Sequence, residues 1–266
     1  MGWIYNWFGI GKSDEETEDE EFERLVKEGK IKREYFNYKY REPKVLETIE
    51  GSYKDWWAFM MKYPRLVMYL GARRVGKTCA AMNISENLAK KKKMIIQTIG
   101  MEEAELPNFI QNVGNIEEVE NDSILVLGEG GVEFNSRNSM GKTNKNLSKL
   151  LPILSHREIY AHFCSQMGSI SDKNLIYCSD TIVLLKNSLM QLSKGGERPV
   201  VIDLYKKYLP YINKHIKKVG SEKGVAAIHS EDFKGIIRFR VPGWFNDSIS
   251  KSYKDKKIFG EKEVVQ

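Results

Sequence analysis

The stretch from Leu66 to Lys93 constrains the fold of this chain more than any other. An apolar run at 66–70 stops at Gly71, and the sequence Gly-Ala-Arg-Arg-Val-Gly-Lys-Thr (71–78) then opens an amphipathic segment. This is the complete G-x-x-x-x-G-K-[ST] pattern, with a strand expected before it and a helix after it. The pattern predicts a phosphate-binding loop, and the alternative is a chance glycine turn between a strand and a helix.

Each fixed position of the pattern has a chemical reason. Gly71 and Gly76 let the backbone wrap closely around a phosphate, where side chains would clash. Successive N–H groups, backed by the positive end of the following helix, then point at the anion. The Lys77 ammonium would contact the β- and γ-phosphates, and the Thr78 hydroxyl would ligate Mg²⁺. We therefore expect ATP and Mg²⁺ here. The expected contact residues are Gly71, Ala72, Arg73, Arg74, Val75, Gly76, Lys77, Thr78 and Cys79.

Charge, hydrophobic content and cysteine spacing indicate which kinds of partner, compartment and fold suit this chain. The net charge of +6 permits an anionic partner such as DNA without demanding one. Hydrophobic residues make up 41% of the chain, enough for a buried core. No uninterrupted apolar run reaches the ~18–20 residues that span a bilayer. The cysteines (Cys79, Cys164 and Cys178) have no metal-ligand spacing, so we expect buried free thiols in a reducing compartment, which favours the cytoplasm.

Further apolar runs predict a mainly parallel sheet flanked by helices. Strands are expected after the phosphate loop at 94–99, 123–127, 159–164, 180–185 and 199–205, with edge strands at 225–228 and 235–241. Helices are expected at 55–63, 78–89 and 145–154, and a helix with a loop at 101–120. The alternation of strands and helices indicates an α/β fold.

Polar residues close two of the expected strands. The strand at 123–127 is followed by Gly128 and Glu129. In P-loop ATPases this strand ends in Asp-Glu, where the Asp holds Mg²⁺ and the Glu polarises the attacking water. Because Gly128 replaces the Asp, Glu129 could take either role, or Glu133 could supply a carboxylate; the alternative is an ordinary strand ending in a turn.

The strand at 159–164 ends in Ser165-Gln166. A polar residue at the carboxyl end of a strand beside the phosphate-loop strand is placed to sense the γ-phosphate. The competing interpretation is a buried structural glutamine.

Taken together, these motifs resemble the FtsK–HerA superfamily of P-loop ATPases, especially its viral genome-packaging and Zot-like members. The resemblance covers about residues 64–190. It rests on the phosphate loop, the strand ending in Glu129, the sequence Phe-Asn-Ser-Arg that ends at Arg137, a helix ending in His-Arg157, and the strand ending in Gln166.

The resemblance implies a three-layer, RecA/FtsK-like P-loop NTPase. Glu129 would prime water and, with Thr78, ligate Mg²⁺, while Gln166 would sense the γ-phosphate. An arginine, either Arg137 or Arg157, would reach into the site of a neighbouring subunit. The resemblance also implies a homo-oligomer, a hexameric ring, that acts on DNA.

Two functions of different classes follow. The first is an ATP-hydrolysing motor that translocates DNA, most simply to package a viral genome in the host cytoplasm. The second is a membrane-associated virion assembly protein that binds nucleotide with little or no hydrolysis, which Gly128 favours. A metabolic kinase is a third class, but no acceptor-substrate motif is recognisable.

The two ends flank an expected ATPase domain at 45–245. An N-terminal arm at 1–44 has an aromatic tip, an acidic run and a basic, aromatic linker, and a polar tail occupies 246–266. The tip either lies in a membrane interface or partner groove, such as a virion shell, or packs back on the domain. The lysine-rich, aromatic segment 206–219 suits either a DNA backbone or a solvated amphipathic helix.

Overall fold

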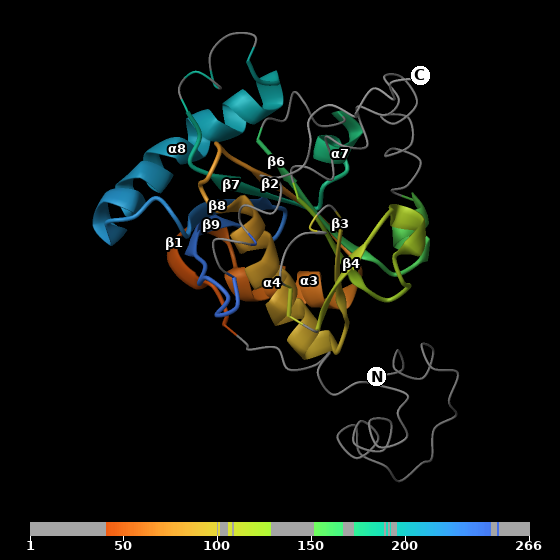
Figure 1. The fold of residues 1–266 in the computed structure, drawn as a ribbon. Coiled ribbons are helices and arrows are strands. Elements are labelled where there is room, and N and C mark those ends of the chain that lie inside the picture. The colour runs from red at the N-terminus through yellow and green to blue at the C-terminus, as the bar shows by residue number, and fades with distance from the viewer. Residues whose placement is uncertain are drawn as a thin grey trace, which may run out of the picture.

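The computed structural model of this chain describes residues 41–99, 101, 106–107, 109–128, 152–166, 173–188, 190, 192, 196–245 and 249. The predictions for the tip, the acidic run and the basic, aromatic linker (27–40) of the arm, for Glu129, Glu133 and Arg137, and for all of the tail except Ile249 lie outside these residues. The described residues form one sheet with helices on both faces (Figure 1).

The described part of the chain contains nine strands and four α-helices. The strands are β1 (Lys44–Gly51), β2 (Leu66–Leu70), β3 (Ile96–Ile99), β4 (Ile110–Val113), β5 (Ile124–Leu127), β6 (Tyr160–Ser165), β7 (Thr181–Leu185), β8 (Val225–Ser230) and β9 (Phe233–Arg238). The helices are α3 (Tyr53–Lys62), α4 (Lys77–Lys92), α7 (Lys173–Tyr177) and α8 (Pro199–Val219), with a short 3₁₀ turn at Ile116–Glu118.

The sheet confirms the predicted fold class. Its strand order is β1-β9-β8-β7-β2-β6-β5-β3-β4. The six strands from β7 to β4 run parallel, and β8, β9 and β1 extend the sheet antiparallel. Because β6 lies between β2 and β5, the strand that ends at Gln166 is the direct neighbour of the phosphate-loop strand.

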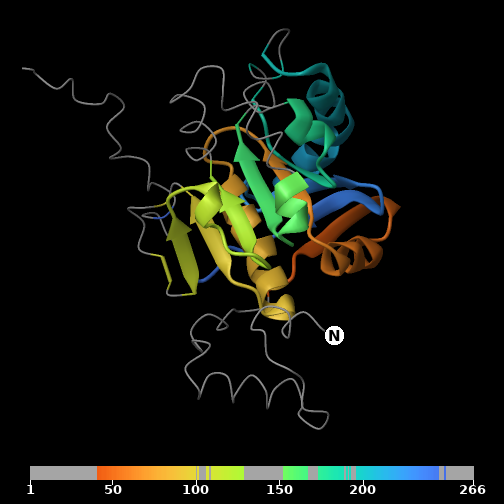
Figure 2. The ribbon, with the colours of Figure 1, turned by 90° about the vertical axis from the view of Figure 1, so that its right-hand side faces the viewer.

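Two cores fill the space between the sheet and its helices. Helices α3 and α4 pack on one face, and α7 and α8 pack on the other (Figures 1 and 2). The parallel strands β2, β5 and β7 are buried almost throughout, which explains their nearly continuous apolar sequences. Helix α4 is buried at Lys77 and from Cys79 to Ala89, so the helix behind the phosphate loop lies at the centre of the molecule.

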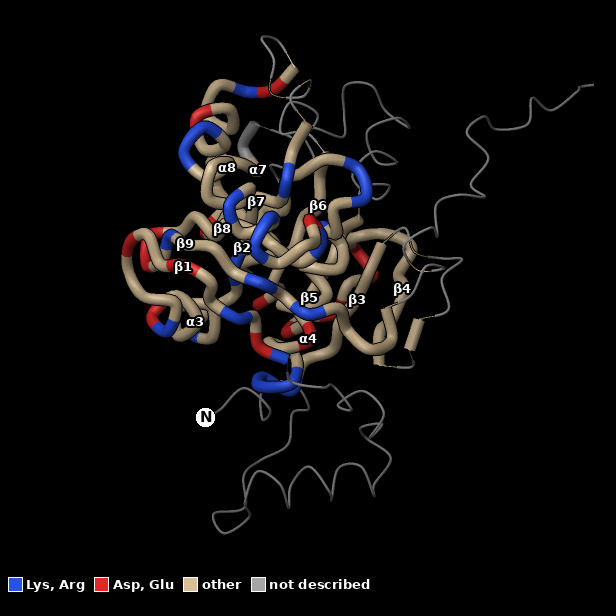
Figure 3. Tube along the Cα trace, turned by 90° about the vertical axis from the view of Figure 1, so that its left-hand side faces the viewer, with Lys and Arg blue, Asp and Glu red and all other residues tan. Residues whose placement is uncertain are grey.

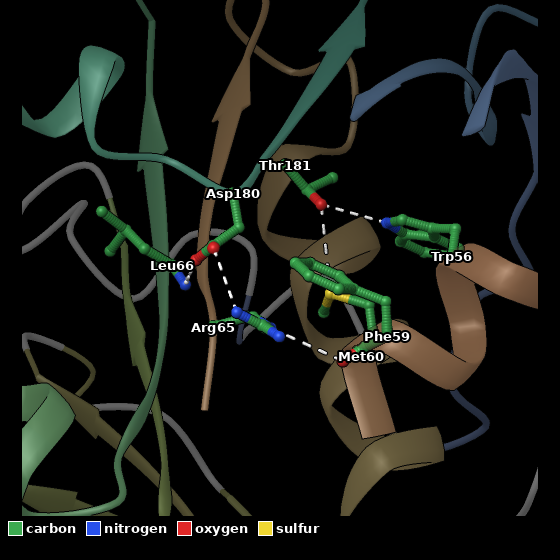
Figure 4. Close-up of polar contacts among 7 residues, drawn as sticks. All are labelled: Trp56, Phe59, Met60, Arg65, Leu66, Asp180 and Thr181. Carbon is green, nitrogen blue, oxygen red and sulfur yellow. Dashed lines mark hydrogen bonds and ion pairs between the residues drawn. The ribbon is translucent and has the colours of Figure 1, made fainter. Parts of the chain in front are cut away.

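A hydrogen-bonded cluster ties α3 to the amino ends of β2 and β7 (Figure 4). The Trp56 indole N–H donates to Thr181 Oγ1 at 3.0 Å. Asp180 accepts from the backbone N–H of Leu66 at 2.8 Å and from Arg65 at 3.3 Å. These contacts fix where β2 begins, at the edge of the sheet opposite the phosphate loop.

The sequence prediction is wrong at the segment 199–205. This segment is the first part of α8 rather than a strand. Val200, Val201 and Ile202 favour a strand locally, but the apolar positions of the longer segment recur at helical spacing, and they are buried at Val201, Tyr205, Tyr208, Ile212 and His215. Pro199 at the first helical position also suits a helix start.

The edges of the sheet also differ from the prediction. Strand β8 is internal, and the described edge strands are β1 and β4. Strand β4 lies within the segment 101–120, where a helix was expected. Both edge strands are partly exposed and contain charged or amide side chains, so they lack a strong apolar signal.

The cysteines and the lengths of the helices also bear on the sequence predictions. Cys79 and Cys164 are buried free thiols as expected, whereas Cys178 is exposed. In the part of the chain that the structure describes, no helix has both the length and the apolar character needed to cross a membrane.

Candidate functional site

The phosphate loop joins β2 to α4 through a tight turn. Gly76 has φ +99° and Arg74 has φ +62°, both in the left-handed region. A Cβ atom on Gly71 would lie 3.0 Å from the side chains of Leu185 and Val75 and 3.3 Å from the carbonyl oxygen of residue 186. Glycine is therefore favoured at 71 by close packing and at 76 by backbone conformation.

The side chain of Lys77 lies inside this turn. Its Nζ donates to the carbonyl oxygens of Gly71 at 2.9 Å and Ala72 at 2.7 Å, and the residue is only 3% exposed. The N-cap of α4 is Gly76, which has no side chain that could cap the N-terminal amides of the helix. A buried ammonium and a helix start converge on one loop, which suits a phosphate.

One wall of the loop comes from the β7 side. The Ala72 N–H donates to the carbonyl oxygen of Lys186, directly after β7, at 3.0 Å. Lys186 Nζ forms an ion pair with Glu222 Oε2 at 2.7 Å. The Phe239 ring packs beside Gly76, and its backbone N–H donates to Gly224 at 2.9 Å. The segments 222–224 and 239 therefore brace the phosphate loop.

The other wall comes from β6. In the parallel register Leu70 lies opposite Ser165, so Gln166 follows β6 at the level where Gly71 follows β2. Arg73 Nε donates to Gln166 Oε1 at 2.9 Å. Gln166 is half-buried rather than a core residue, and it lies beside the loop. Its role as a γ-phosphate sensor stays a prediction.

The third predicted strand end is at the same edge. Strand β5 runs parallel to β6 and ends at Leu127, opposite Phe163. Gly128, the residue that replaces the expected Asp, is buried. Since Glu129 lies outside the described residues, its part in priming water or holding Mg²⁺ stays a prediction.

Arg157 lies at the opposite edge of the sheet, just before β6. Its Nε donates to Asn121 Oδ1 at 2.7 Å, and its NH2 group donates to the carbonyl oxygen of Val119. Within its own subunit the Arg157 side chain therefore does not meet the phosphate loop. The action of Arg137 or Arg157 on a neighbouring subunit stays a prediction.

Sequence reasoning missed a buried polar cluster beneath the site. The Nδ1 atom of His162, on β6, is hydrogen-bonded to the Tyr69 hydroxyl of β2 at 2.9 Å and lies 3.4 Å from the Ser85 hydroxyl of α4. Burial lowers the pKa of His162 to about 3, so the ring is neutral. The cluster joins the three elements that position Lys77 and Gln166. The scattered histidines of the sequence predict only satisfied polar roles, and nothing in the sequence indicates the partners of His162.

The predicted contact at Cys79 is limited to its backbone. Its thiol is buried in the core below the loop, and burial raises its pKa to about 12. The thiol is therefore protonated and unreactive. Among the residues that the structure describes, no cluster of His, Cys, Asp and Glu could hold a metal ion. Of the two predicted Mg²⁺ ligands, Thr78 and Glu129, only Thr78 lies among these residues.

Comparison with known proteins gives distant structural likenesses only. No family model and no curated protein matches the chain. It is similar to the genome packaging NTPase B204 of Sulfolobus turreted icosahedral virus 2, with 11% identity over 67% of this chain and 98% of that chain, at a TM-score of 0.44.

Two secretion proteins are similar at the same level. EssC (ATPases 2 and 3) from Geobacillus thermodenitrificans shares 11% identity over 71% of this chain and 43% of that chain, at a TM-score of 0.42. The cytoplasmic domain of the Thermomonospora curvata type VII secretion ATPase EccC shares 9% identity over 76% and 26%, at a TM-score of 0.45. The chain thus spans less than half of either. All three are ATPases or NTPases by name.

Proposed function

We propose that this chain binds ATP with Mg²⁺ at the loop 71–78, hydrolyses it and uses the energy to translocate DNA, as viral genome-packaging motors do. One observation carries the nucleotide part of the proposal. The loop that encloses the Lys77 ammonium and the residue Gln166 follow adjacent parallel strands, and Arg73 joins them directly. A terminal phosphate in the loop would therefore lie within reach of a polar residue from the neighbouring strand.

Different groups of the loop would contact the phosphates and the Mg²⁺ ion. The backbone N–H groups of 73–78, at the loop and the start of α4, would hold the phosphate oxygens. Lys77 would place its ammonium against the β- and γ-phosphates, from the position where the carbonyls of Gly71 and Ala72 now hold it. Thr78, in the first turn of α4, would hold Mg²⁺, which supplies charge neutralisation at the phosphates.

Hydrolysis needs groups beyond the loop. Glu129 would orient or deprotonate the attacking water, and Gln166 would report the state of the γ-phosphate. Arg137 or Arg157 of an adjacent subunit in a ring, six subunits by resemblance, would stabilise charge on the phosphoryl group. Arginine fingers supply ~10³ to 10⁵ in rate elsewhere.

The buried Gly128 favours a second candidate function. This residue directly follows β5 and lacks the carboxylate that P-loop ATPases place there. An assembly protein that binds ATP and turns it over slowly, or not at all, would tolerate that loss. ATP turnover separates the two candidates, because both of them bind nucleotide.

The test compares ATP hydrolysis with and without DNA in the wild type, Lys77→Ala and Glu129→Gln. The motor predicts turnover that DNA stimulates and that each variant lowers at least ~100-fold, as expected for loss of a group that stabilises the transition state. Lys90→Ala, at the exposed far end of α4, is the matched control for Lys77→Ala and keeps wild-type turnover. ATP binding without turnover supports the assembly protein instead.

A further inference from the structure

Helix α8 has two faces of opposite character. One face is buried against the sheet through Val201, Tyr205, Tyr208, Ile212 and His215. The opposite face is exposed and strongly basic. Figure 3 marks the positions of basic and acidic residues along the chain trace of the helix. Its exposed charged residues are Asp203, Lys206, Lys207, Lys214, Lys217 and Lys218. We call these five lysines the α8 lysine face.

Two of the five lysines are neutralised within the chain. Lys206 pairs with Asp203 at 3.1 Å. Lys214 pairs with Glu47 of β1 at 2.9 Å. Among the residues that the structure describes, no carboxylate forms an ion pair with Lys207, Lys217 or Lys218. These three charges remain to attract an anion from solution.

The positive field extends from α8 onto the sheet. The pKa of Glu50, on β1, is lowered first by its hydrogen bond to Lys234 and, more weakly, by the nearby charge of Lys207. Lys207 and Lys234 also lower the pKa of His229, although burial is the larger cause. The lysines of α8 and β9 therefore act on the same groups. From Lys206 to Lys218 the face is about 18 Å long at 1.5 Å per residue.

The aromatic side chains of the segment point away from this face. Tyr205 and Tyr208 are completely buried, and Tyr211 is half-buried, so α8 has no exposed tyrosine on which a base could stack. Proteins that bind single strands combine basic grooves with aromatic stacking platforms. A face of lysines alone suits the regularly spaced phosphates of a duplex, without reading its sequence.

The end of α8 also leads directly to the phosphate loop. The helix ends at Gly220, whose φ is +74°, and the next four residues return the chain to β8. Within that turn Glu222 pairs with Lys186, and the carbonyl oxygen of Lys186 accepts from the N–H of Ala72. A ligand on Lys217 and Lys218 would thus lie one short turn away from residues that brace the phosphate loop.

We propose that the α8 lysine face binds the phosphate backbone of duplex DNA, and that this contact raises ATP turnover through the turn 220–224. The proposal deepens the proposed function, on which it rests for DNA as the partner, by assigning the DNA-binding surface and its connection to the nucleotide site.

The test measures duplex DNA binding without nucleotide, so that it does not depend on ATP hydrolysis. The variant Lys217→Glu/Lys218→Glu should lose at least ~10-fold in affinity at low salt, and the slope of log affinity against log salt should fall by ~0.9 for each lost phosphate contact. The matched control is Lys90→Glu/Lys91→Glu, the same charge change at the last turn of α4, and it should bind DNA as the wild type does. Thermal melting confirms that both variants fold.

Several outcomes would overturn the proposal. These are wild-type DNA affinity in Lys217→Glu/Lys218→Glu, an equal loss in the control, and tighter binding of a single strand or of anionic vesicles than of duplex DNA. Lys77→Ala should bind DNA as the wild type does. The DNA-binding result therefore stays interpretable even if the protein does not hydrolyse ATP. If the wild type hydrolyses ATP, loss of DNA stimulation in Lys217→Glu/Lys218→Glu supports the connection, and full stimulation contradicts it.

Discussion

The Arg73 guanidinium donates its Nε–H to Oε1 of Gln166 across 2.9 Å, which joins the phosphate loop to the carboxyl end of the neighbouring strand. Because Arg73 belongs to the loop and contacts the predicted sensor Gln166, their bond can couple the loop to that sensor. We therefore expect Arg73→Ala and Gln166→Ala to affect ATP turnover non-additively.

A double-mutant cycle on ATP turnover measures this coupling. Because the bond is charge-assisted but exposed, we expect an interaction of about 0.5–1 kcal/mol, equivalent to about two- to five-fold in rate. Strict additivity of the two single substitutions would show that the contact has no part in turnover.

Gly71→Ala should abolish nucleotide binding. The added methyl group would lie 3.0 Å from Leu185 and Val75, so β7 or the loop must shift. We expect at least ~100-fold weaker ATP affinity, because the loop can no longer close around a phosphate. The measurement is a titration with a fluorescent ATP analogue.

The control is Gly220→Ala, at the end of α8. A Cβ at Gly220 meets nothing within 4 Å, and only its φ of +74° is unfavourable. This variant should lose about 1 kcal/mol of stability and keep its ATP affinity. Equal ATP affinities in the two variants would contradict the packing argument for Gly71.

His162 should make the stability of the protein sensitive to acid. Its pKa of about 3 in the fold lies below the ordinary value of 6.5, because burial disfavours the charged ring. The stabilising contribution of the neutral ring is therefore complete above pH 6.5. It declines as the pH falls towards 3, because the unfolded chain takes up a proton that the fold does not.

The comparison with His162→Gln isolates this effect. The wild type should be more stable than the variant at pH 8, because the variant loses the contact with Tyr69, and that advantage should shrink by about 1–2 kcal/mol between pH 7 and pH 5. Urea unfolding at each pH gives the free energies, and His156→Gln, at an exposed site, is the control. A difference between the wild type and His162→Gln that stays constant with pH would refute the prediction.

The hydrogen bonds of Asp180 to Arg65 and Leu66, at the start of β2, should stabilise the fold without changing nucleotide binding. Asp180→Ala removes the acceptor for the Leu66 N–H and for Arg65, so we expect a loss of about 1–3 kcal/mol. Asp180→Asn keeps one acceptor oxygen and should lose less. ATP affinity should be unchanged in both, since these hydrogen bonds lie at the opposite edge of the sheet from the loop.

The central part of the fold could be predicted because it depends on short-range patterns. The nearly continuous apolar sequences of β2, β5 and β7 indicate buried parallel strands, and the glycines and Lys77 identify the loop between β2 and α4. The position of Gln166 follows from these, because parallel strands end at the same edge of a sheet. That inference assumes that the strand ending at Gln166 lies beside the phosphate-loop strand, and the observed strand order confirms the assumption.

The parts that could not be predicted depend on contacts between distant segments. Helix α8 begins with β-branched residues, and its helical periodicity emerges only over the whole helix. The pairing of Lys186 with Glu222 and of Tyr69 with His162 joins residues far apart in the chain, with no local signal in either partner. The Arg73–Gln166 bond likewise requires the register of β2 and β6 to be known.

The most direct test of the central claim is a crystal structure with Mg²⁺ and a non-hydrolysable ATP analogue. We predict that the phosphates lie in the loop 71–78, with the γ-phosphate in hydrogen-bond reach of Lys77 and beside Gln166 at the end of β6. A triphosphate bound elsewhere, or a γ-phosphate directed away from β6, would contradict the account.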